Sequence, residues 1–139
     1  MGRTITEQEQ QTASDALDAS TTTILASDFI IEGGVLRQYR GTSENVTIPN
    51  GVFGIGPLAF FKNGERLTSV TIPNRVTKIY GGAFENCFKL TSVTFESANI
   101  TFDESNYGST FPDSLSLINE YKAGGIGTYK KTNGRWTKQ

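Results

Sequence analysis

Two consecutive segments of the chain repeat each other, and this repetition constrains the fold more than any other feature. Residues 46–69 read VTIPNGVFGIGPLAFFKNGERLTS, and residues 70–92 read VTIPNRVTKIYGGAFENCFKLTS. The copies match at thirteen positions when one extra residue is placed between Phe60 and Asn63, which gives periods of 24 and 23 residues. Such periods are too short for a pair of helices but suit one strand and a return path per coil.

Each repeat contains apolar residues that alternate with small hydroxyl residues, at 67–72 and again at 90–95. This alternation predicts a strand with one face inward, and Pro73, which has no N–H donor, ends the first of these strands. A second short apolar pair, at 52–55 and at 76–79, is expected on the return side. Stacked coils would align Val46 with Val70 and Val93, Ile48 with Ile72 and Phe95, and Phe60 with Phe84.

The pattern V-T-I-P-x-x-V-x-x-I-x-x-x-A-F-x-x-C-x-x-L-x-S-V resembles the BspA-like leucine-rich repeats of bacterial surface proteins. The resemblance covers residues 29–139, and the ending EYKAGGIGTYKKTNGRWTKQ is similar to the closure of these proteins. Cys87 falls on the Cys position of that family, and the first copy has Asn63 nearby. The resemblance implies a mainly β fold with minor α, a short leucine-rich-repeat solenoid.

The flanking segments predict caps for the two ends of the solenoid. We expect a leader at 1–28, as a weak helix or a mobile segment, and a single domain at 29–139. Within that domain, 29–45 forms an N-terminal hairpin, 46–112 holds the repeats, and 113–139 forms a C-terminal cap. Asp113 is the expected N-cap of a short helix that Gly124 and Gly125 end, and Asn133-Gly134 predicts a hairpin turn.

Composition excludes several classes of chemistry. The chain has no histidine and one cysteine, Cys87, so it has no Ser-His-Asp or Cys-His system, no His-ligated metal site and no internal disulfide. Cys87 is expected to be buried, and Asp103, Glu104 and Asp113 match no EF-hand spacing. The sequence therefore predicts no enzyme, no cofactor and no bound metal, although those three carboxylates would support an enzyme if they met in a pocket.

The resemblance implies a non-enzymatic binding or adhesion module that is secreted or on the cell surface, with a protein partner such as host extracellular matrix. The net charge of −1 argues against a nucleic-acid partner, and no apolar run is long enough to span a membrane. No signal peptide is visible at residues 1–18. A carbohydrate-binding module and an intracellular interaction scaffold remain as alternatives.

Two sets of residues are candidates for the binding surface. The outward positions of the repeated strands form a hydroxyl array that could contact peptide, sugar or ordered water, or could simply reflect the strand propensity of threonine. Aromatic residues that the repeat pattern does not require would form a contact patch if they lay on one side. The first set is Thr47, Thr68, Ser69, Thr71, Thr91, Ser92 and Thr94, and the second is Phe53, Phe61 and Tyr80.

Charge separates along the chain. Residues 1–32 carry six acidic groups and one basic group, whereas five basic groups and no acidic group follow Glu120. The two ends therefore differ in sign, which permits head-to-tail association between copies. The alternative is that these charges only make the two ends soluble, because exposed charge pairs contribute little in water.

Overall fold

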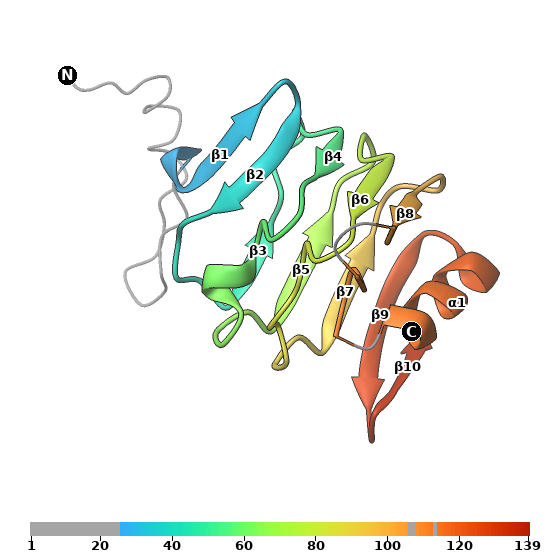
Figure 1. Ribbon diagram of the computed structural model, residues 1–139. Coiled ribbons are helices and arrows are strands. Elements are labelled where there is room, and N and C mark those ends of the chain that lie inside the picture. The colour runs from blue at the N-terminus through green and yellow to red at the C-terminus, as the bar shows by residue number, and fades with distance from the viewer. Residues whose placement is uncertain (1–25, 106–107, 113) are drawn as a thin grey trace.

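The chain winds into coils, each of which contributes one strand to each of two sheets around a shared core (Figure 1). This computed structural model describes residues 26–105, 108–112 and 114–139. The strands are β1 (Phe29–Glu32), β2 (Val35–Tyr39), β3 (Asn45–Thr47), β4 (Gly54–Ile55), β5 (Ser69–Ile72), β6 (Lys78–Tyr80), β7 (Ser92–Phe95), β8 (Thr101–Asp103), β9 (Gly127–Thr132) and β10 (Arg135–Lys138). The helices are the 3₁₀ turns η2 (Ala26–Asp28) and η3 (Phe61–Asn63) and the α-helix α1 (Ser114–Gly124).

Sheet A has the strand order β1-β2-β4-β6-β8, and sheet B has the order β10-β9-β7-β5-β3. In sheet B, β3, β5 and β7 are parallel, and Val46 pairs with Val70, which pairs with Val93. In sheet A, Ile55 of β4 pairs with Ile79 of β6. Consecutive coils therefore superpose equivalent residues, and the predicted mainly β solenoid with its stacked valines is confirmed.

A column of aromatic rings runs through the corner of the coils where sheet A leads into sheet B. Hydrogen bonds from the backbone N–H of three ring residues to the next coil hold the corner; they join Tyr39 to the Ala59 carbonyl at 2.8 Å, Phe60 to the Ala83 carbonyl at 2.9 Å and Phe84 to the Thr110 carbonyl at 2.9 Å. All of these rings are buried. In order along the solenoid, the column consists of Phe29, Tyr39, Phe60, Phe84 and Phe111, with centroid separations of 5.0, 5.5, 4.9 and 4.8 Å.

The extra residue of the first repeat lies after Asn63, not before it. The Asn63 N–H donates to the Phe60 carbonyl, and the Cys87 N–H donates to the Phe84 carbonyl in the same way. Asn63 and Cys87 therefore occupy equivalent buried positions, three residues after the ring of their coil. The predicted position of the extra residue, between Phe60 and Asn63, is wrong. Matching identical residues aligned Asn63 with Asn86, whereas burial and backbone hydrogen bonding make Asn63 equivalent to Cys87.

A hairpin covers the N-terminal end of sheet A, as predicted. β1 pairs antiparallel with β2, and β2 continues into the parallel ladder through β4. The turn uses Gly33 and Gly34, whose φ angles of 59° and 78° lie in the left-handed region that glycine adopts without strain. The second of these glycines also gives the ring of Phe53 room, because a Cβ at Gly34 would overlap that ring.

A helix and a hairpin cover the C-terminal end, again as predicted. β9 pairs antiparallel with β7, and it connects to β10 through Asn133 and Gly134, both with positive φ. Tyr121 of α1 donates its hydroxyl proton to the Ser97 carbonyl at 2.7 Å and accepts the Ile100 N–H at 3.3 Å, so the helix is fixed on the β7–β8 connection.

Parts of the expected organisation lie outside the described residues. These parts are most of the leader at 1–28 and the helix N-cap at Asp113. The division of the chain into a leader, 29–45, 46–112 and 113–139 stays a prediction. The helix ends at Gly124, and Gly125, with φ of 71°, donates its N–H to the Tyr121 carbonyl as a glycine C-cap does.

Candidate binding surface

The outer face of sheet B is a regular array of hydroxyl side chains. Valines at the middle of β3, β5 and β7 point into the core, so their neighbours along each strand point outward. The parallel register then aligns Thr47 with Thr71 and Thr94, and Ser69 with Ser92. We call this array the hydroxyl surface; it consists of Thr47, Thr68, Ser69, Thr71, Thr91, Ser92 and Thr94.

Some hydroxyls of this surface bond to neighbouring strands, and others do not. Ser69 Oγ donates to Asn45 Oδ1 at 2.6 Å, and Thr94 and Thr128 share a hydrogen bond of 2.8 Å. The hydroxyls of Thr47, Thr71, Thr91 and Ser92 bond to no residue that the structure describes. The surface therefore combines a rigid frame with donors and acceptors that are available to a ligand.

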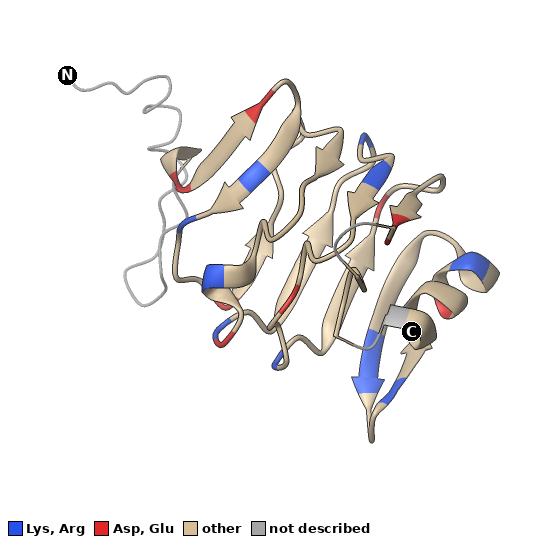
Figure 2. Ribbon diagram, viewed as in Figure 1, with Lys and Arg blue, Asp and Glu red and all other residues tan. Residues whose placement is uncertain are grey.

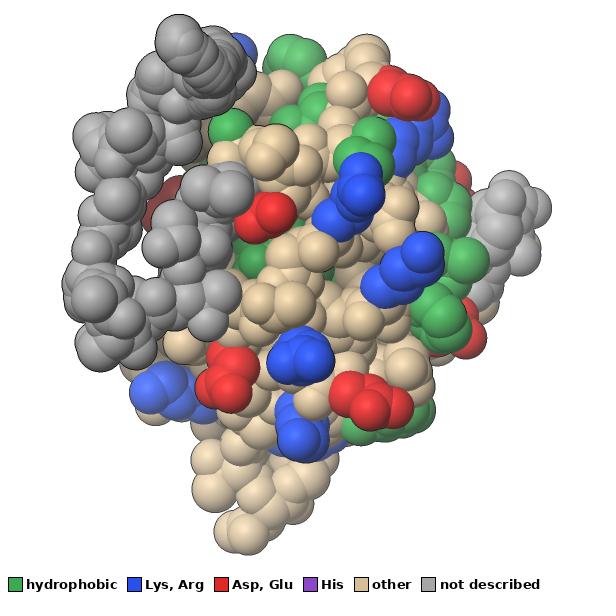
Figure 3. Space-filling view, turned by 90° about the vertical axis from the view of Figure 1, so that its left-hand side faces the viewer, with side chains coloured by type: hydrophobic (Ala, Val, Ile, Leu, Met, Phe, Trp, Pro, Cys, Tyr) green, Lys and Arg blue, Asp and Glu red, His purple; other side chains and the backbone are tan. Residues whose placement is uncertain are grey.

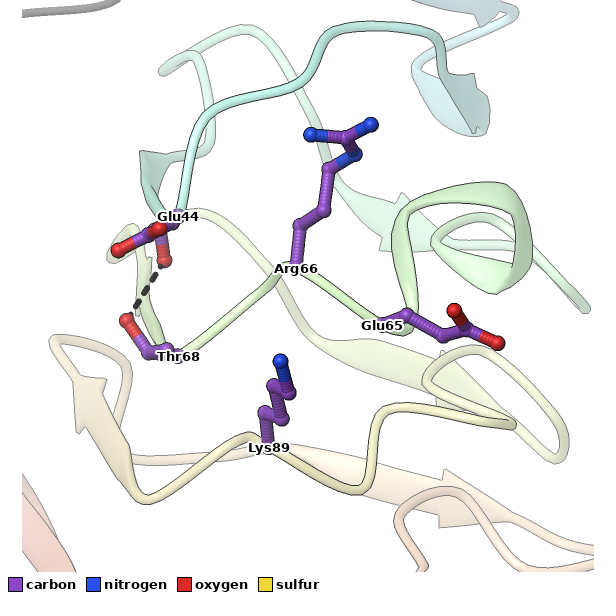
Figure 4. Close-up of a pocket in the computed structure, with 5 residues that line it drawn as sticks. All are labelled: Glu44, Glu65, Arg66, Thr68 and Lys89. Carbon is purple, nitrogen blue, oxygen red and sulfur yellow. Dashed lines mark hydrogen bonds between the residues drawn. The ribbon is translucent and has the colours of Figure 1, made fainter.

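A polar hollow of about 400 Å³ adjoins the hydroxyl surface where the strands of sheet B begin (Figure 4). Thr68 belongs to both, and its Oγ1 donates to the Glu44 carbonyl at 3.0 Å. The lining carries two charges of each sign, and no ion pair joins them among the described residues. The hollow is lined by Glu44, Glu65, Arg66, Thr68 and Lys89.

The three candidate aromatic residues lie away from the hydroxyl surface. Phe53, with 51% of its surface exposed, precedes β4 and packs beside the β1–β2 turn. Tyr80 faces outward from sheet A, and Lys78 Nζ lies 4.9 Å from the centroid of its ring. Phe61 is 43% exposed in η3, at the corner between the sheets. The sequence-based candidates therefore divide between two different regions of the solenoid.

The cysteine is poorly suited to nucleophilic chemistry. Cys87 is buried, and its Sγ lies 3.7 Å from the Phe60 carbonyl oxygen, to which it donates. Burial raises the pKa of the thiol from 9.0 to about 12. Because the thiolate is the reactive form of cysteine, this side chain is inert at neutral pH.

The candidate carboxylates are engaged in local structure. Asp103 accepts from Ser105 Oγ at 2.6 Å and pairs with Lys78 Nζ at 3.5 Å, and the bonds from Ser105 lower its pKa. Glu104 accepts the Thr110 N–H at 2.6 Å. Asp113 lies outside the described residues, which contain no group of three or more His, Cys, Asp or Glu side chains able to hold a metal.

Sequence reasoning missed the charged residues that border the hydroxyl surface. Glu44, Arg66 and Lys89 come from the loops that lead into the strands, where the repeat pattern is least regular. The signal that could have found them is the extra residue of the first repeat, because it enlarges the loop that carries Arg66. Among the described residues, no helix has the length and apolar character needed to cross a bilayer.

Comparison with known proteins places this architecture in a family. The model of the "BspA type Leucine rich repeat region (6 copies)" matches residues 38–122, more than half of the chain. No curated protein matches. Among solved structures, a leucine rich cell surface protein from Faecalibacterium prausnitzii A2-165 is 29% identical, with a TM-score of 0.47, over 55% of this chain and 24% of that one. The chain thus spans about a quarter of that protein. With its two-sheet coils and the matching family model, the chain belongs to the BspA-type leucine-rich repeat family.

Proposed function

We propose that the chain is a non-enzymatic protein-interaction module of a secreted or surface protein, and that the hydroxyl surface contacts an adhesion partner such as a host extracellular-matrix protein. The observation that carries this proposal is the register of sheet B, which sets free hydroxyls of Thr47 and Thr71 on adjacent strands of a rigid face. Membership of a leucine-rich repeat family supports an interaction role, and the buried thiol of Cys87 agrees with a role that involves no covalent chemistry.

The dimensions of the surface predict how strong such binding is. The hydroxyl surface spans three strands about 4.8 Å apart, each about four residues long, and so presents roughly 190 Å². A stable interface needs about 800 Å² from each partner. A partner must therefore extend beyond the hydroxyl surface, and the adjoining hollow with Glu44, Arg66 and Lys89 supplies the nearest additional polar contacts. Binding is expected to be weak for a single module and to weaken further as salt screens these charges.

A pair of matched substitutions tests this proposal. Thr71→Lys places a long charged side chain at the middle of the hydroxyl surface, and Thr77→Lys makes the same change at an exposed position beside sheet A. Binding to a panel of purified matrix proteins is measured by surface plasmon resonance. We expect Thr71→Lys to weaken capture by about tenfold or more, and Thr77→Lys to leave it within about twofold.

The aromatic candidates provide the competing outcome. If Thr71→Lys binds like the parent chain, while replacing Phe53, Phe61 and Tyr80 by Ser abolishes capture, then the partner contacts sheet A and the η3 corner instead. That result would overturn the assignment to the hydroxyl surface. Failure of every matrix protein to bind would overturn the adhesion role.

A further inference from the structure

A second polar hollow, of about 420 Å³, lies at the end of β2 and beside η3. Its lining contains three cationic side chains and no carboxylate, unlike the hollow beside Thr68. The Asp28 carboxylate lies near its margin, beside Gly41. We call this site the basic hollow; it is lined by Gln38, Tyr39, Arg40, Gly41, Thr42, Lys62, Asn63 and Arg66.

The three cations of the basic hollow come from separate segments of the chain. Arg40 follows β2, Lys62 lies in η3, and Arg66 lies in the loop that leads toward β5. No ion pair joins any of them to a described carboxylate. In Figure 4 the Arg66 side chain extends away from Glu65 and Lys89. Figure 3 shows this end of the molecule, where basic side chains project from the surface and acidic side chains lie among them.

The floor of the basic hollow is fixed by buried hydrogen bonds that converge on Ser43. Tyr39 Oη accepts the Ser43 N–H at 3.3 Å, and Asn63 Nδ2 donates to the Ser43 carbonyl at 3.0 Å. These bonds join the segment that carries Arg40 to the turn that carries Lys62. The cations are therefore held on a rigid frame, which lowers the entropic cost of binding an anion between them.

The basic hollow lies where the first repeat differs from the consensus of the repeats. The loop from Asn63 to Leu67 is one residue longer than the loop from Cys87 to Leu90, and the longer loop carries Arg66. A shorter loop, with Phe88 and Lys89, follows Cys87 in the next coil. The hollow is thus particular to this coil and is not a feature of every repeat.

We propose that the basic hollow binds an anionic saccharide, with carboxylate or sulfate groups at Arg40, Lys62 and Arg66 and sugar hydroxyls at Gln38 and Thr42. Its volume is within the range of small-ligand sites. A hydroxyl-rich anion fits this lining better than an acidic peptide does, because the lining holds no exposed apolar side chain to anchor a peptide. Arg66 lines both hollows, whereas Arg40 and Lys62 line only the basic hollow. Saccharide binding is measured without a protein partner, so its outcome is distinguishable from that of the matrix-protein test.

The test measures binding of a heparin-derived hexasaccharide and of hexagalacturonate by isothermal titration calorimetry at low salt. The variant Arg40→Gln/Lys62→Gln/Arg66→Gln removes the three cations of the basic hollow. The control Lys122→Gln/Lys130→Gln/Arg135→Gln removes the same charge from exposed positions at the opposite end, where Figure 2 marks basic residues on α1, β9 and β10. We expect the first variant to lose about tenfold or more in affinity, and the control to stay within about twofold.

A third variant tests whether lost binding reflects lost charge or a disturbed fold. Arg40→Lys/Lys62→Arg/Arg66→Lys keeps all three charges, so it should bind more tightly than the glutamine variant, although it loses the forked contacts of two arginines and should bind less tightly than the parent chain. Equal losses in the glutamine variant and in its control would show general charge attraction and overturn the site. Binding of hexaglutamate as tight as that of both saccharides would overturn the saccharide assignment in favour of an acidic peptide. Absence of binding by both saccharides at millimolar concentration would overturn the proposal altogether.

Discussion

The rings of Phe60 and Phe84 stack with their centroids 4.9 Å apart and their planes 7° from parallel. The stack continues to Phe111, whose ring lies 4.8 Å from that of Phe84 at an interplanar angle of 9°. Equivalent positions in successive coils place these side chains directly above one another, so the ring of one coil forms the packing surface of the next. This column connects the two complete repeats to the capped ends of the solenoid.

Replacing the central ring of this column should be far more costly than replacing an exposed one. Phe84→Ala removes a fully buried side chain between two stacked rings, and those rings cannot move in to fill the cavity. The substitution should therefore lower the free energy of unfolding by about 3–5 kcal/mol. Phe88→Ala, four residues later, changes a side chain that is 73% exposed and should change stability by less than about 0.5 kcal/mol. Urea unfolding of both variants checks the difference. Equal losses would show that the stack contributes no more than surface packing.

The sequence predicted the stack only where the repeats are visibly alike. Phe60 and Phe84 match within an Ala-Phe pair, so their alignment follows from the period. Tyr39 and Phe111 belong to the same column but lie 21 and 27 residues from their neighbours, in segments that share little with the consensus. Their positions depend on the lengths of loops in the outer coils, which periodicity does not determine.

The candidate binding surfaces were likewise predictable only where the repeats are regular. Alternation predicted that Thr71 and Thr94 face outward, because Val70 and Val93 must face the core. The location of Phe53 was not predictable in this way, since β4 is only two residues long and both of its residues are buried. The basic hollow was missed because it joins loops from two coils through the buried contacts of Ser43.

The equivalence of Asn63 and Cys87 gives a prediction about the first repeat. Asn63→Ala removes the bond to the Ser43 carbonyl and should lower the free energy of unfolding by about 1–3 kcal/mol. Asn63→Cys should cost less than Asn63→Ala, because a thiol occupies the equivalent buried position in the next coil and leaves a smaller cavity than a methyl group does. Chemical denaturation of the two variants provides the comparison. A cysteine variant less stable than the alanine variant would contradict the equivalence.

The contact between Gly34 and Phe53 predicts a measurable coupling. Gly34→Ala combines a left-handed backbone with overlap of the Phe53 ring, so it should cost more than the strain of about 1–2 kcal/mol expected for the backbone alone. In the background of Phe53→Ala, the same substitution should cost only the backbone part. Gly33→Ala is the matched control, because its φ is 59° and a Cβ there meets no atom within 4 Å. A double-mutant cycle with no coupling would show that the ring moves aside freely.

Burial of the Cys87 thiol predicts a loss of stability at alkaline pH. The folded chain holds the pKa of this thiol at about 12, against 9.0 when unfolded, so folding favours the neutral form. The buried neutral thiol makes its full contribution to the free energy of unfolding below pH 9. That contribution declines as the pH rises toward 12, and the loss is roughly 2 kcal/mol at about pH 10.5. Urea unfolding across this pH range measures the decline.

Cys87→Ser separates this effect from the alkaline titration of the buried tyrosines. A serine hydroxyl is of similar size, can donate to the Phe60 carbonyl, and does not ionise in this range. Burial also raises the pKa of Tyr39, Tyr121 and Tyr129, and their contribution is present in both chains. The parent chain should therefore lose more stability than the variant between pH 9 and about 11. Any difference in free energy of unfolding that favours the parent chain at neutral pH should shrink over this range. Parallel pH profiles for the two chains would mean that the thiolate is tolerated in this site.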